Sequence, residues 1–587
     1  MMSSPSSAEH LDTLKTQWMA SWESALAAWS SYTKLSPPRF CFTDEDEKAE
    51  GLSVSFAMIR LRDHAVVIGL RQVVELGLED FGEEILAHEI GHHVFVPGDL
   101  GDHARHLAHI RAGIPSREQH AALVANLYAD LLINDRLQRT RGMDIAGVYV
   151  KLRQEQPGRL WTLYMRIYEI LWELSPGTLV NGELSPEIVR DAPLGARLVR
   201  NYAKQWLDGA GRFGALCLPY LLEDWKTQES EGMPWLDAVL AGAGDALPDG
   251  LASRDPGELE GAIHPALDDD LSGVTSAPPQ PLSLDEAPPP VIGREEVGGQ
   301  KNLYRTPSEY NDLMRSLGVE IRPEDLTIQY YRERARPYLI KFPTREVRHA
   351  TDPLPEGLEV WEPGAPISAV DWVESVSRSP VVIPGFTTVE RTYGETAGSS
   401  PEHQPVDLYL GIDCSGSMTN PRHNISYPVL AGAVMTLSAL RAGAQVRTTL
   451  SGEPGEFTST GDYSRSEKKN LGVLTGYLGT GYAFGIKRLE ADFLHSTPRK
   501  RPVHIMVITD ADIFHMLNET REGWDIARDA PKIAGGGATF VLDWYDTQVY
   551  DADIARLRSL DWDVHFVRDQ QELVTFARAF SKRTFER

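Results

Sequence analysis

The chain has 587 residues, of which 42% are hydrophobic and 24% charged, and this composition is typical of globular proteins. Its length predicts about two to four domains. The formal net charge of −26 disfavours nucleic acid as a partner, because binding phosphates needs a basic surface. The sequence has no run of about twenty apolar residues, so we expect no membrane-spanning segment and no membrane partner.

The start of the chain and its cysteines favour a cytoplasmic protein. Residues 1–10 lack the basic and apolar regions of a secretory signal peptide. Cys41, Cys217 and Cys414 lie far apart, a spacing that favours neither a disulfide framework nor a cysteine-based zinc site. We therefore expect the protein to work in the reducing environment of the cytoplasm.

The patterns along the chain predict an α/β multidomain protein with four parts. The first part is mainly helical, and the second is an acidic linker rich in proline and glycine. The third is an intermediate segment that packs on the last part, and the last part is a doubly wound parallel sheet. The predicted boundaries are residues 1–222, 223–302, 303–401 and 402–587.

An amphipathic helix and three short strands open the first part. Residues 9–33 carry large apolar side chains at helical spacing, which predicts a helix that packs inward on one face. These side chains are Leu11, Leu14, Trp18, Trp22, Leu26 and Trp29. Three β-rich runs follow, and a turn at Arg62 and Asp63 predicts a hairpin between the last two. The runs are residues 39–43, 53–61 and 64–70.

The next predicted helix runs from about Asp80 to just before Pro97 and contains the pattern H-E-x-x-H as His88, Glu89 and His92. Because an α-helix has 3.6 residues per turn, the two histidines project from one face and can hold one Zn²⁺. Glu89 lies beside them as the candidate general base. A catalytic zinc site needs a third protein ligand and one open position.

The residues that follow the motif do not supply the third ligand at the metzincin spacing. In the pattern H-E-x-x-H-x-x-G-x-x-H, the last glycine and the last histidine are replaced here by Phe95 and Gly98. The histidines of the next stretch are expected on a solvated, partly helical surface. They are His103, His106 and His109.

The third ligand is predicted on the following helix. Asn126, Asp130 and Asn134 recur every four residues and form one polar stripe on an otherwise apolar helix. A buried carboxylate must be paired or bound to a metal, because desolvating it alone is costly. We therefore predict Asp130 as the third zinc ligand and the two asparagines as residues that support the zinc ligands. The alternative is a stripe that faces water. Tyr128 and His93 are weaker candidates for steadying the oxyanion, and His93 is expected to be a neighbour of the zinc rather than a ligand.

These two helices resemble a known bacterial family. The patterns H-E-I-G-H and N-x-x-A-D-x-x-I-N, over residues 50–140, are similar to the metallopeptidase-like domain that precedes von Willebrand factor A (VWA) domains. The resemblance implies a zincin-like fold, a zinc ion and peptidase activity. Such relatives often carry a further histidine shortly after the motif, where this chain has Pro97.

The middle of the chain carries less information about function. Residues 144–222 predict a helical scaffold with Trp161 and Trp172 in its core, and the alternative is that these two side chains line a groove. Residues 223–300 contain seventeen acidic residues and three basic ones, a net charge of −14, which predicts a mobile, extended tether. Residues 303–400 regain helical and β-like patterns but indicate no chemistry.

The last part opens with a buried-type strand, residues 406–412, that runs into Asp413, Ser415 and Ser417 in the pattern D-x-S-x-S. Strands and helices then alternate, which predicts a parallel sheet with its ligand site at the carboxyl ends of the strands. The predicted helices are 427–442 and 483–494, and the predicted strands are 445–450, 503–509, 539–542 and 564–567.

This order and the D-x-S-x-S pattern resemble the metal-ion-dependent adhesion site of VWA domains. The resemblance implies a threonine from a later loop and an aspartate after the next strand, and Thr480 and Asp510 fill these places, with Thr475 in reserve. The hydroxyl and carboxylate oxygens suit Mg²⁺, with one position open for a partner's carboxylate. Asp512 stands where a glycine is more usual, and Cys414 is expected to be packed rather than reactive.

Two functions stay open at this point. The first is an intracellular zinc metallopeptidase that cuts a protein or peptide and recruits a partner through its magnesium-binding VWA domain. By resemblance, the expected partner is an AAA+ ATPase of the MoxR type. The second is a non-catalytic adaptor that couples such an ATPase to its target. Glu89 favours the enzyme, because a structural zinc site has no use for a glutamate base.

Overall fold

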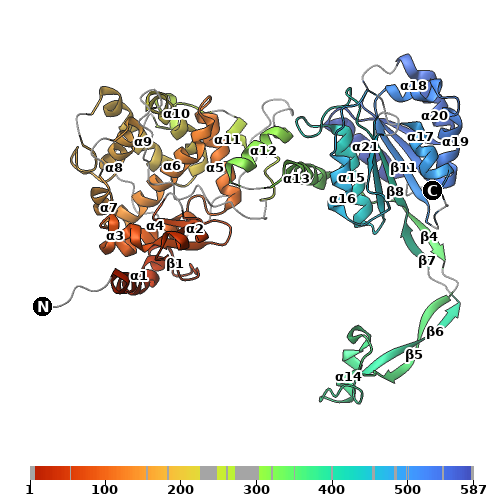
Figure 1. Cartoon of the computed structure of the whole chain (residues 1–587), viewed down its shortest axis with the longest axis horizontal. Coiled ribbons are helices and arrows are strands. Elements are labelled where there is room, and N and C mark those ends of the chain that lie inside the picture. The colour runs from red at the N-terminus through yellow and green to blue at the C-terminus, as the bar shows by residue number, and fades with distance from the viewer. Residues whose placement is uncertain are drawn as a thin grey trace. The chain divides into compact units, whose positions relative to one another are not determined.

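The computed structural model divides the chain into two compact units, Met1–Glu333 and Arg334–Arg587 (Figure 1). The described residues are 7–52, 55–153, 157–181, 184–224, 248–259, 262–271, 303–318, 321–348, 351–397, 401–452, 456–481, 485–496, 499, 501–544 and 548–583. None of the helices formed by these residues is both long and apolar enough to cross a membrane. Helices and strands are both abundant, so the α/β class is confirmed.

The N-terminal unit is mainly helical and contains a small sheet with the strand order β1-β3-β2. β1 and β3 are parallel, whereas β2 and β3 form the predicted antiparallel hairpin. The strands are β1 (Arg39–Cys41), β2 (Ala57–Arg60) and β3 (Ala65–Gly69). The helices are α1 (Ser7–Trp29), α2 (Asp44–Glu50), α3 (Leu70–Glu75), α4 (Gly82–Val94), α5 (Leu100–Gly113), α6 (Ala121–Arg136), α7 (Ile145–Lys151), α8 (Arg159–Leu171), α9 (Pro186–Asn201), α10 (Trp206–Asp224), α11 (Pro256–Leu259), α12 (Pro307–Ser316) and α13 (Pro323–Ala335), which crosses the boundary.

The tryptophans of α1 fasten this helix to the start and middle of α4. Trp18, Trp22 and Trp29 are each at most 3% exposed, as the helical stripe predicted. The Trp18 indole N–H donates to the Glu79 carbonyl just before α4 at 3.0 Å, and Trp29 donates to the Ala87 carbonyl within α4 at 2.7 Å. Buried tryptophans with a satisfied N–H both fill the core and fix the position of their neighbour.

Part of the predicted linker is folded and belongs to the N-terminal unit. Residues 248–259 and 262–271 are described, while 225–247 and 272–302 lie outside the described residues. The Asp268 carboxylate accepts hydrogen bonds from Tyr202 and from Arg212, both at 2.7 Å. The prediction of an extended tether is therefore wrong for these segments, because specific cations and hydroxyls offset their acidic charge.

The intermediate segment is divided between the two units. Residues 303–333 belong to the N-terminal unit, where Tyr304 pairs with Ser253 in an antiparallel bridge. The expectation that 303–401 packs on the last domain is therefore wrong for its first third. The remainder contributes two ribbons to the C-terminal unit, in which β4 (Thr344–Arg348) pairs with β7 (Pro401–Pro405) and β5 (Thr351–Val360) with β6 (Val389–Ala397). Helix α14 (Trp372–Arg378) contacts β6.

A six-stranded sheet organises the C-terminal unit, with the order β10-β9-β8-β11-β12-β13 among the described residues. Neighbouring strands are parallel except for β10, an antiparallel edge strand that was not predicted. The strands are β8 (Asp407–Asp413), β9 (Val446–Ser451), β10 (Phe457–Ser459), β11 (Val503–Thr509), β12 (Gly535–Leu542) and β13 (Trp562–Phe566). The helices are α15 (Tyr427–Arg441), α16 (Glu467–Leu474), α17 (Ile486–Leu489), α18 (Asp512–Glu519), α19 (Gly523–Ala534), α20 (Asp551–Ser559) and α21 (Gln570–Arg583).

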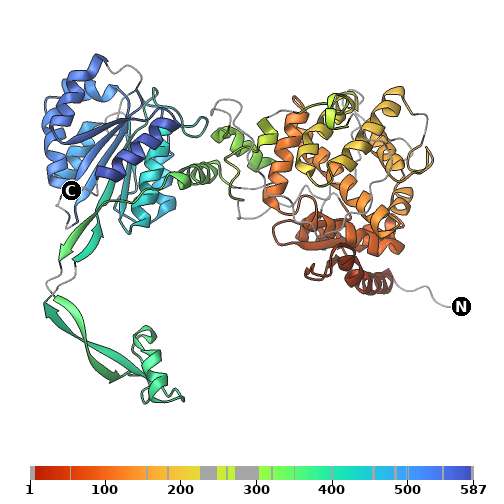
Figure 2. The ribbon, with the colours of Figure 1, turned by 180° about the vertical axis from the view of Figure 1, so that it is seen from behind.

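Helices cover both faces of this sheet, because successive strand side chains point to opposite sides. Tyr409, Ile505 and Val507 belong to the core shared with α17, α18 and α19. Leu410 and Ile508 face α15, which approaches them closely at Gly432. Figures 1 and 2 show α15, α16 and α21 on one side of the sheet and α17 to α20 on the other.

The strand order reverses next to β8, and this places the candidate magnesium site. The chain goes from β8 to β9 on one side and later returns to β11 on the other. In open α/β sheets, ligands bind at such a switch point, at the carboxyl ends of the strands. Asp413 ends β8 and Asp510 directly follows β11, so both carboxylates lie at this point.

Candidate metal centres

Helices α4 and α6 bring the three predicted zinc ligands together. The Asp130 Oδ1 atom lies 3.3 Å from the His92 Nε2 atom and 3.6 Å from the His88 Nε2 atom. The two imidazole rings are perpendicular, with their centroids 4.9 Å apart. These atoms are close enough to share one ion, and together they form one of the groups of potential metal ligands among the described residues.

Hydrogen bonds to the other ring nitrogen orient both histidines. The His92 Nδ1 atom lies 3.0 Å from the Val96 carbonyl, and the His88 Nδ1 atom lies 2.7 Å from the Asn134 Oδ1 atom. A proton on each Nδ1 leaves the Nε2 lone pair directed at Asp130. Asn134 thus supports His88, the role predicted for it.

Two tyrosines fix the orientation of the Asn134 amide. Its Nδ2 group donates to the Tyr149 hydroxyl at 3.0 Å and to the Tyr168 hydroxyl at 2.8 Å, so its oxygen must face His88. Tyr164 extends this network, because its hydroxyl lies 2.9 Å from that of Tyr168. Burial raises the pKa of Tyr164 and Tyr168 well above the usual value, so both hydroxyls keep their protons.

The polar stripe of α6 is buried, and this rules out the alternative that it faces water. Asn126, Asp130 and Asn134 are at most 4% exposed. The Asn126 Nδ2 group donates to the Asp130 Oδ2 atom at 3.1 Å, which leaves Oδ1 for another partner. Neither that Oδ1 atom nor the His92 Nε2 atom forms a hydrogen bond to the described protein. Two imidazole nitrogens and a carboxylate oxygen are the donors that zinc prefers, so the residues fit this ion.

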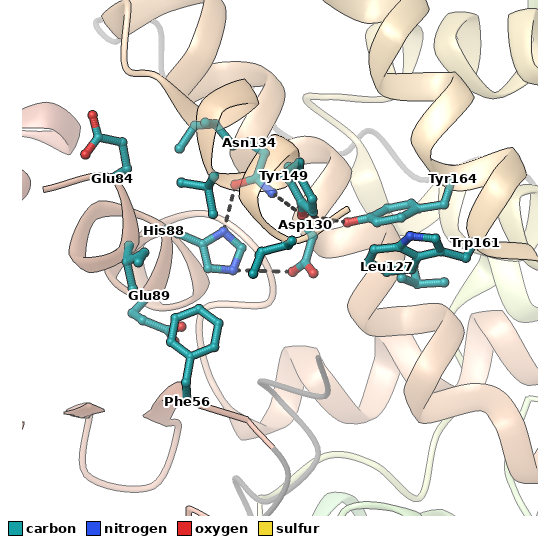
Figure 3. Close-up of a pocket in the computed structure, with 14 residues that line it drawn as sticks. Phe56, Glu84, His88, Glu89, Leu127, Asp130, Asn134, Tyr149, Trp161 and Tyr164 are labelled. Carbon is teal, nitrogen blue, oxygen red and sulfur yellow. Dashed lines mark hydrogen bonds and ion pairs between the residues drawn. The ribbon is translucent and has the colours of Figure 1, made fainter. Parts of the chain in front are cut away.

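A cleft adjoins these side chains and contains the candidate base. It has a volume of about 550 Å³, which includes space open to solvent, and Glu89, His88 and Asp130 all line it. Figure 3 shows His88 between Asn134 and Asp130, with Glu89 on the same helix beside Phe56. Glu89 is 1% exposed, so this cleft residue is shielded from bulk solvent.

Gly91 allows α4 to sit this close to its neighbours. A Cβ atom at this position would lie 2.5 Å from Trp29 Cζ2 and 2.7 Å from Ile133 Cγ2, on α1 and α6 respectively. Contacts this short do not occur, so only glycine lets both helices approach α4. The helix ends at Val94, shortly before Pro97, as the sequence predicted.

The prediction that the three histidines after the motif lie on a solvated surface is wrong. His103, His106 and His109 are at most 4% exposed, on a helix that contacts α10, α11 and α12 rather than solvent. Burial lowers the pKa of His103 to about 4 and holds that of His106 well below its usual value, so both are neutral.

The two weaker oxyanion candidates do not line the cleft. The Tyr128 ring is fully buried and stacks on Phe213 with a centroid distance of 5.1 Å. The His93 Nδ1 atom lies 3.2 Å from the Gly98 carbonyl. The hydroxyl-bearing side chains that do line the cleft are Tyr149 and Tyr164. Neither tyrosine was predicted from the sequence as a site residue.

The five predicted magnesium ligands meet at the carboxyl end of the C-terminal sheet. The Ser415 and Ser417 hydroxyl oxygens are 3.0 Å apart, and Ser417 forms a short hydrogen bond to the Asp510 carboxylate. The Ser415 backbone N–H donates to Asp413 Oδ1 at 2.8 Å. Thr480 is held beside them, because its carbonyl accepts from the Gly416 N–H at 2.6 Å. Thr475, the reserve, instead donates to the Leu471 carbonyl of its own helix at 2.9 Å.

The electrostatics of this group fit a divalent cation. Burial, together with the nearby charge of Asp510, raises the pKa of Asp413 to about 6. The Thr480 hydroxyl oxygen is buried and forms no hydrogen bond to the described protein. A cation would offset the repulsion between the carboxylates and satisfy this oxygen, and hard oxygen donors suit Mg²⁺.

The surroundings contain one carboxylate that the sequence did not indicate. Asp543 directly follows β12, and burial together with repulsion by Asp510 raises its pKa to about 6. Because Asp543 directly follows a strand of the parallel sheet, the rule that placed Asp413 and Asp510 could have predicted its position as well. Asp512 has an exposed side chain and contributes its backbone N–H to Asp510 Oδ1 at 2.9 Å. Cys414 is 1% exposed, and burial raises the pKa of its thiol to about 11.

No family model, curated protein or solved structure matches the chain.

Proposed function

We propose that the chain is a zinc metallopeptidase with a zincin-like N-terminal unit and a magnesium-binding VWA domain. The observation that carries this proposal is the convergence of His88, His92 and Asp130 beside a cleft that Glu89 also lines. The hydrogen bonds with Asn134 and Val96 orient the His88 and His92 rings so that their Nε2 atoms both lie near Asp130 Oδ1. A structural zinc site would not need a buried glutamate beside an open cleft.

The roles of the residues follow from their positions. Bound zinc would polarise a peptide carbonyl and make water acidic enough to lose a proton near neutral pH. Glu89 is the carboxylate that takes this proton and returns it to the leaving amine. Tyr149 and Tyr164 line the cleft, and their hydroxyls are the donors available to the carbonyl oxygen.

The wall of the cleft favours apolar substrate side chains. Phe56, Leu127, Val148 and Trp161 line it beside the polar centre. Apolar walls with a few convergent polar groups are typical of ligand sites, and burying an apolar side chain there stabilises the bound peptide. We therefore expect cleavage next to large apolar residues.

The test is cleavage of a quenched fluorescent peptide library by the full chain loaded with zinc. Glu89→Gln should lower cleavage by about 10²- to 10⁴-fold, while the zinc content is unchanged. Glu84→Gln is the matched control, because Glu84 lies on the same helix and lines the same cleft. It should cleave within a few-fold of the parent. Equal cleavage by Glu89→Gln and the parent would remove Glu89 as the base.

For the C-terminal unit we propose recruitment of a protein partner through a magnesium-bound carboxylate, with a MoxR-type AAA+ ATPase as the expected partner. The arrangement of Ser415, Ser417 and Asp510 supports this role independently of the zinc centre. The adaptor function therefore stands as the alternative. Absence of cleavage by the zinc-loaded parent, with partner binding lost in Ser415→Ala, would favour the adaptor.

A further inference from the structure

A second cluster of potential metal ligands lies on the N-terminal unit, separate from the zinc centre. It consists of His109 on α5 and Asp255 and Glu258 at α11, each with a ligand atom within 4.8 Å of the others. The His109 side chain is 5% exposed, and the side chains of Asp255 and Glu258 are 36% and 9% exposed. The cluster is thus buried on one side and reachable from solvent on the other.

Two atoms of this cluster face each other without forming a hydrogen bond. The His109 Nε2 atom and the Asp255 Oδ2 atom are 3.9 Å apart, and neither has a hydrogen-bond partner in the described protein. A buried polar atom without a partner is destabilising, so such a pair calls for a common ligand. Two ligands of one tetrahedral zinc lie about 3.4 Å apart with bonds of about 2.1 Å. The atoms would need to approach by about half an ångström.

Gly257 leaves room for the His109 imidazole ring. A Cβ atom at Gly257 would lie 2.8 Å from His109 Cε1, so glycine is what allows the ring to lie this close to the backbone of α11. Arg305 fixes the third residue, because its Nη2 group donates to both Glu258 carboxylate oxygens at 2.5 Å. A carboxylate has about four acceptor positions, so this pair leaves Glu258 able to bind an ion as well.

We propose that His109, Asp255 and Glu258 form a second site for a first-row transition ion, such as Zn²⁺, that fastens the folded segment 248–259 to α5. One imidazole and two carboxylates suit zinc and its neighbours, whereas Ca²⁺ and Mg²⁺ prefer oxygen ligands throughout. Arg305 and Arg105, the latter 3.7 Å from Asp255 Oδ2, partly neutralise the acidic charge. This site therefore binds its ion more weakly than the centre at His88.

The experiment counts zinc in the full chain by mass spectrometry after dialysis against a limited zinc concentration. Asp130→Ala, which lacks the first centre, should keep one zinc, and Asp130→Ala/Asp255→Asn should keep none. His264→Ala in the Asp130→Ala background is the control, because this histidine lies in a neighbouring segment but outside the cluster. It should keep one zinc.

A second measurement does not depend on the count. Zinc should raise the Tm of Asp130→Ala but leave the Tm of Asp130→Ala/Asp255→Asn unchanged, because an ion stabilises the state that binds it. Circular dichroism would show whether both variants are folded. Absence of zinc from folded Asp130→Ala, or equal zinc in the two variants, would overturn the proposal and leave a water molecule as the ligand of His109 and Asp255.

Discussion

The contact between Asn134 and His88 gives a quantitative prediction about zinc affinity. Replacing Asn134 with leucine keeps a similar volume but removes the acceptor 2.7 Å from His88 Nδ1. The ring then loses the hydrogen bond that keeps its proton on Nδ1. The Nε2 lone pair is therefore no longer fixed in the tautomer and orientation that bind zinc. We expect the zinc dissociation constant of Asn134→Leu to rise markedly while the fold is kept.

The magnitude follows from the two losses that the leucine causes. A buried hydrogen bond contributes about 0.5–1.5 kcal/mol, and loss of the preferred tautomer and ring orientation adds a similar amount. The sum, about 1–3 kcal/mol, corresponds to an affinity weaker by about 5- to 160-fold, which includes the 10- to 100-fold range found for residues that orient metal ligands. Competition with a chromophoric zinc chelator near neutral pH would measure this change.

Two variants separate orientation of His88 from general damage. Asn134→Asp keeps an acceptor for the ring and should restore most of the affinity. Tyr168→Phe removes one of two acceptors of the Asn134 amide and should weaken binding by less than about three-fold. An Asn134→Leu protein that binds zinc as tightly as the parent would refute the reasoning.

Three further changes test other parts of the structure. Gly91→Ala places a methyl group against Trp29 and Ile133. Denaturant titrations should show a free energy of unfolding lower by about 1–3 kcal/mol. Unchanged stability would show that the helices do not pack as described. Ser415→Ala should weaken Mg²⁺ binding at least about ten-fold by calorimetry, and an unchanged affinity would exclude this hydroxyl as a ligand. Burial lowers the pKa of His504 to about 4 from its usual value of about 6.5, so only the unfolded chain takes up this proton as the pH falls between these values. The parent should therefore lose about 2 kcal/mol more stability than His504→Asn between pH 7 and pH 5, and equal losses would contradict the buried, neutral state of His504.

Periodicity in the sequence predicted the parts of the site that lie on single helices. The spacing of His88 and His92 and the stripe that contains Asp130 each depend on 3.6 residues per turn, so they could be read before the fold was known. That α4 and α6 face each other was inferred only from the cost of burying a lone carboxylate. The strand ends at Asp413 and Asp510 could likewise be placed by the rule for parallel sheets.

Features that depend on packing between distant segments could not be predicted in this way. Tyr149 and Tyr168 reach Asn134 from other helices, and no local pattern marks such a contact. His103 has the polarity of a surface residue but is covered by neighbouring helices. The acidic segment around Asp268 has too few apolar residues to predict a fold, yet an ion pair with Arg212 and a hydrogen bond from Tyr202 hold it in place.

The most direct test of the zinc centre is the metal content of the purified chain beside its His88→Ala and Asp130→Ala variants, with magnesium kept in the buffer. Mass spectrometry should show that each variant holds one zinc fewer than the parent while remaining folded by circular dichroism. Equal zinc content in the parent and both variants would contradict the proposed three-ligand centre and the proposed peptidase activity that depends on it.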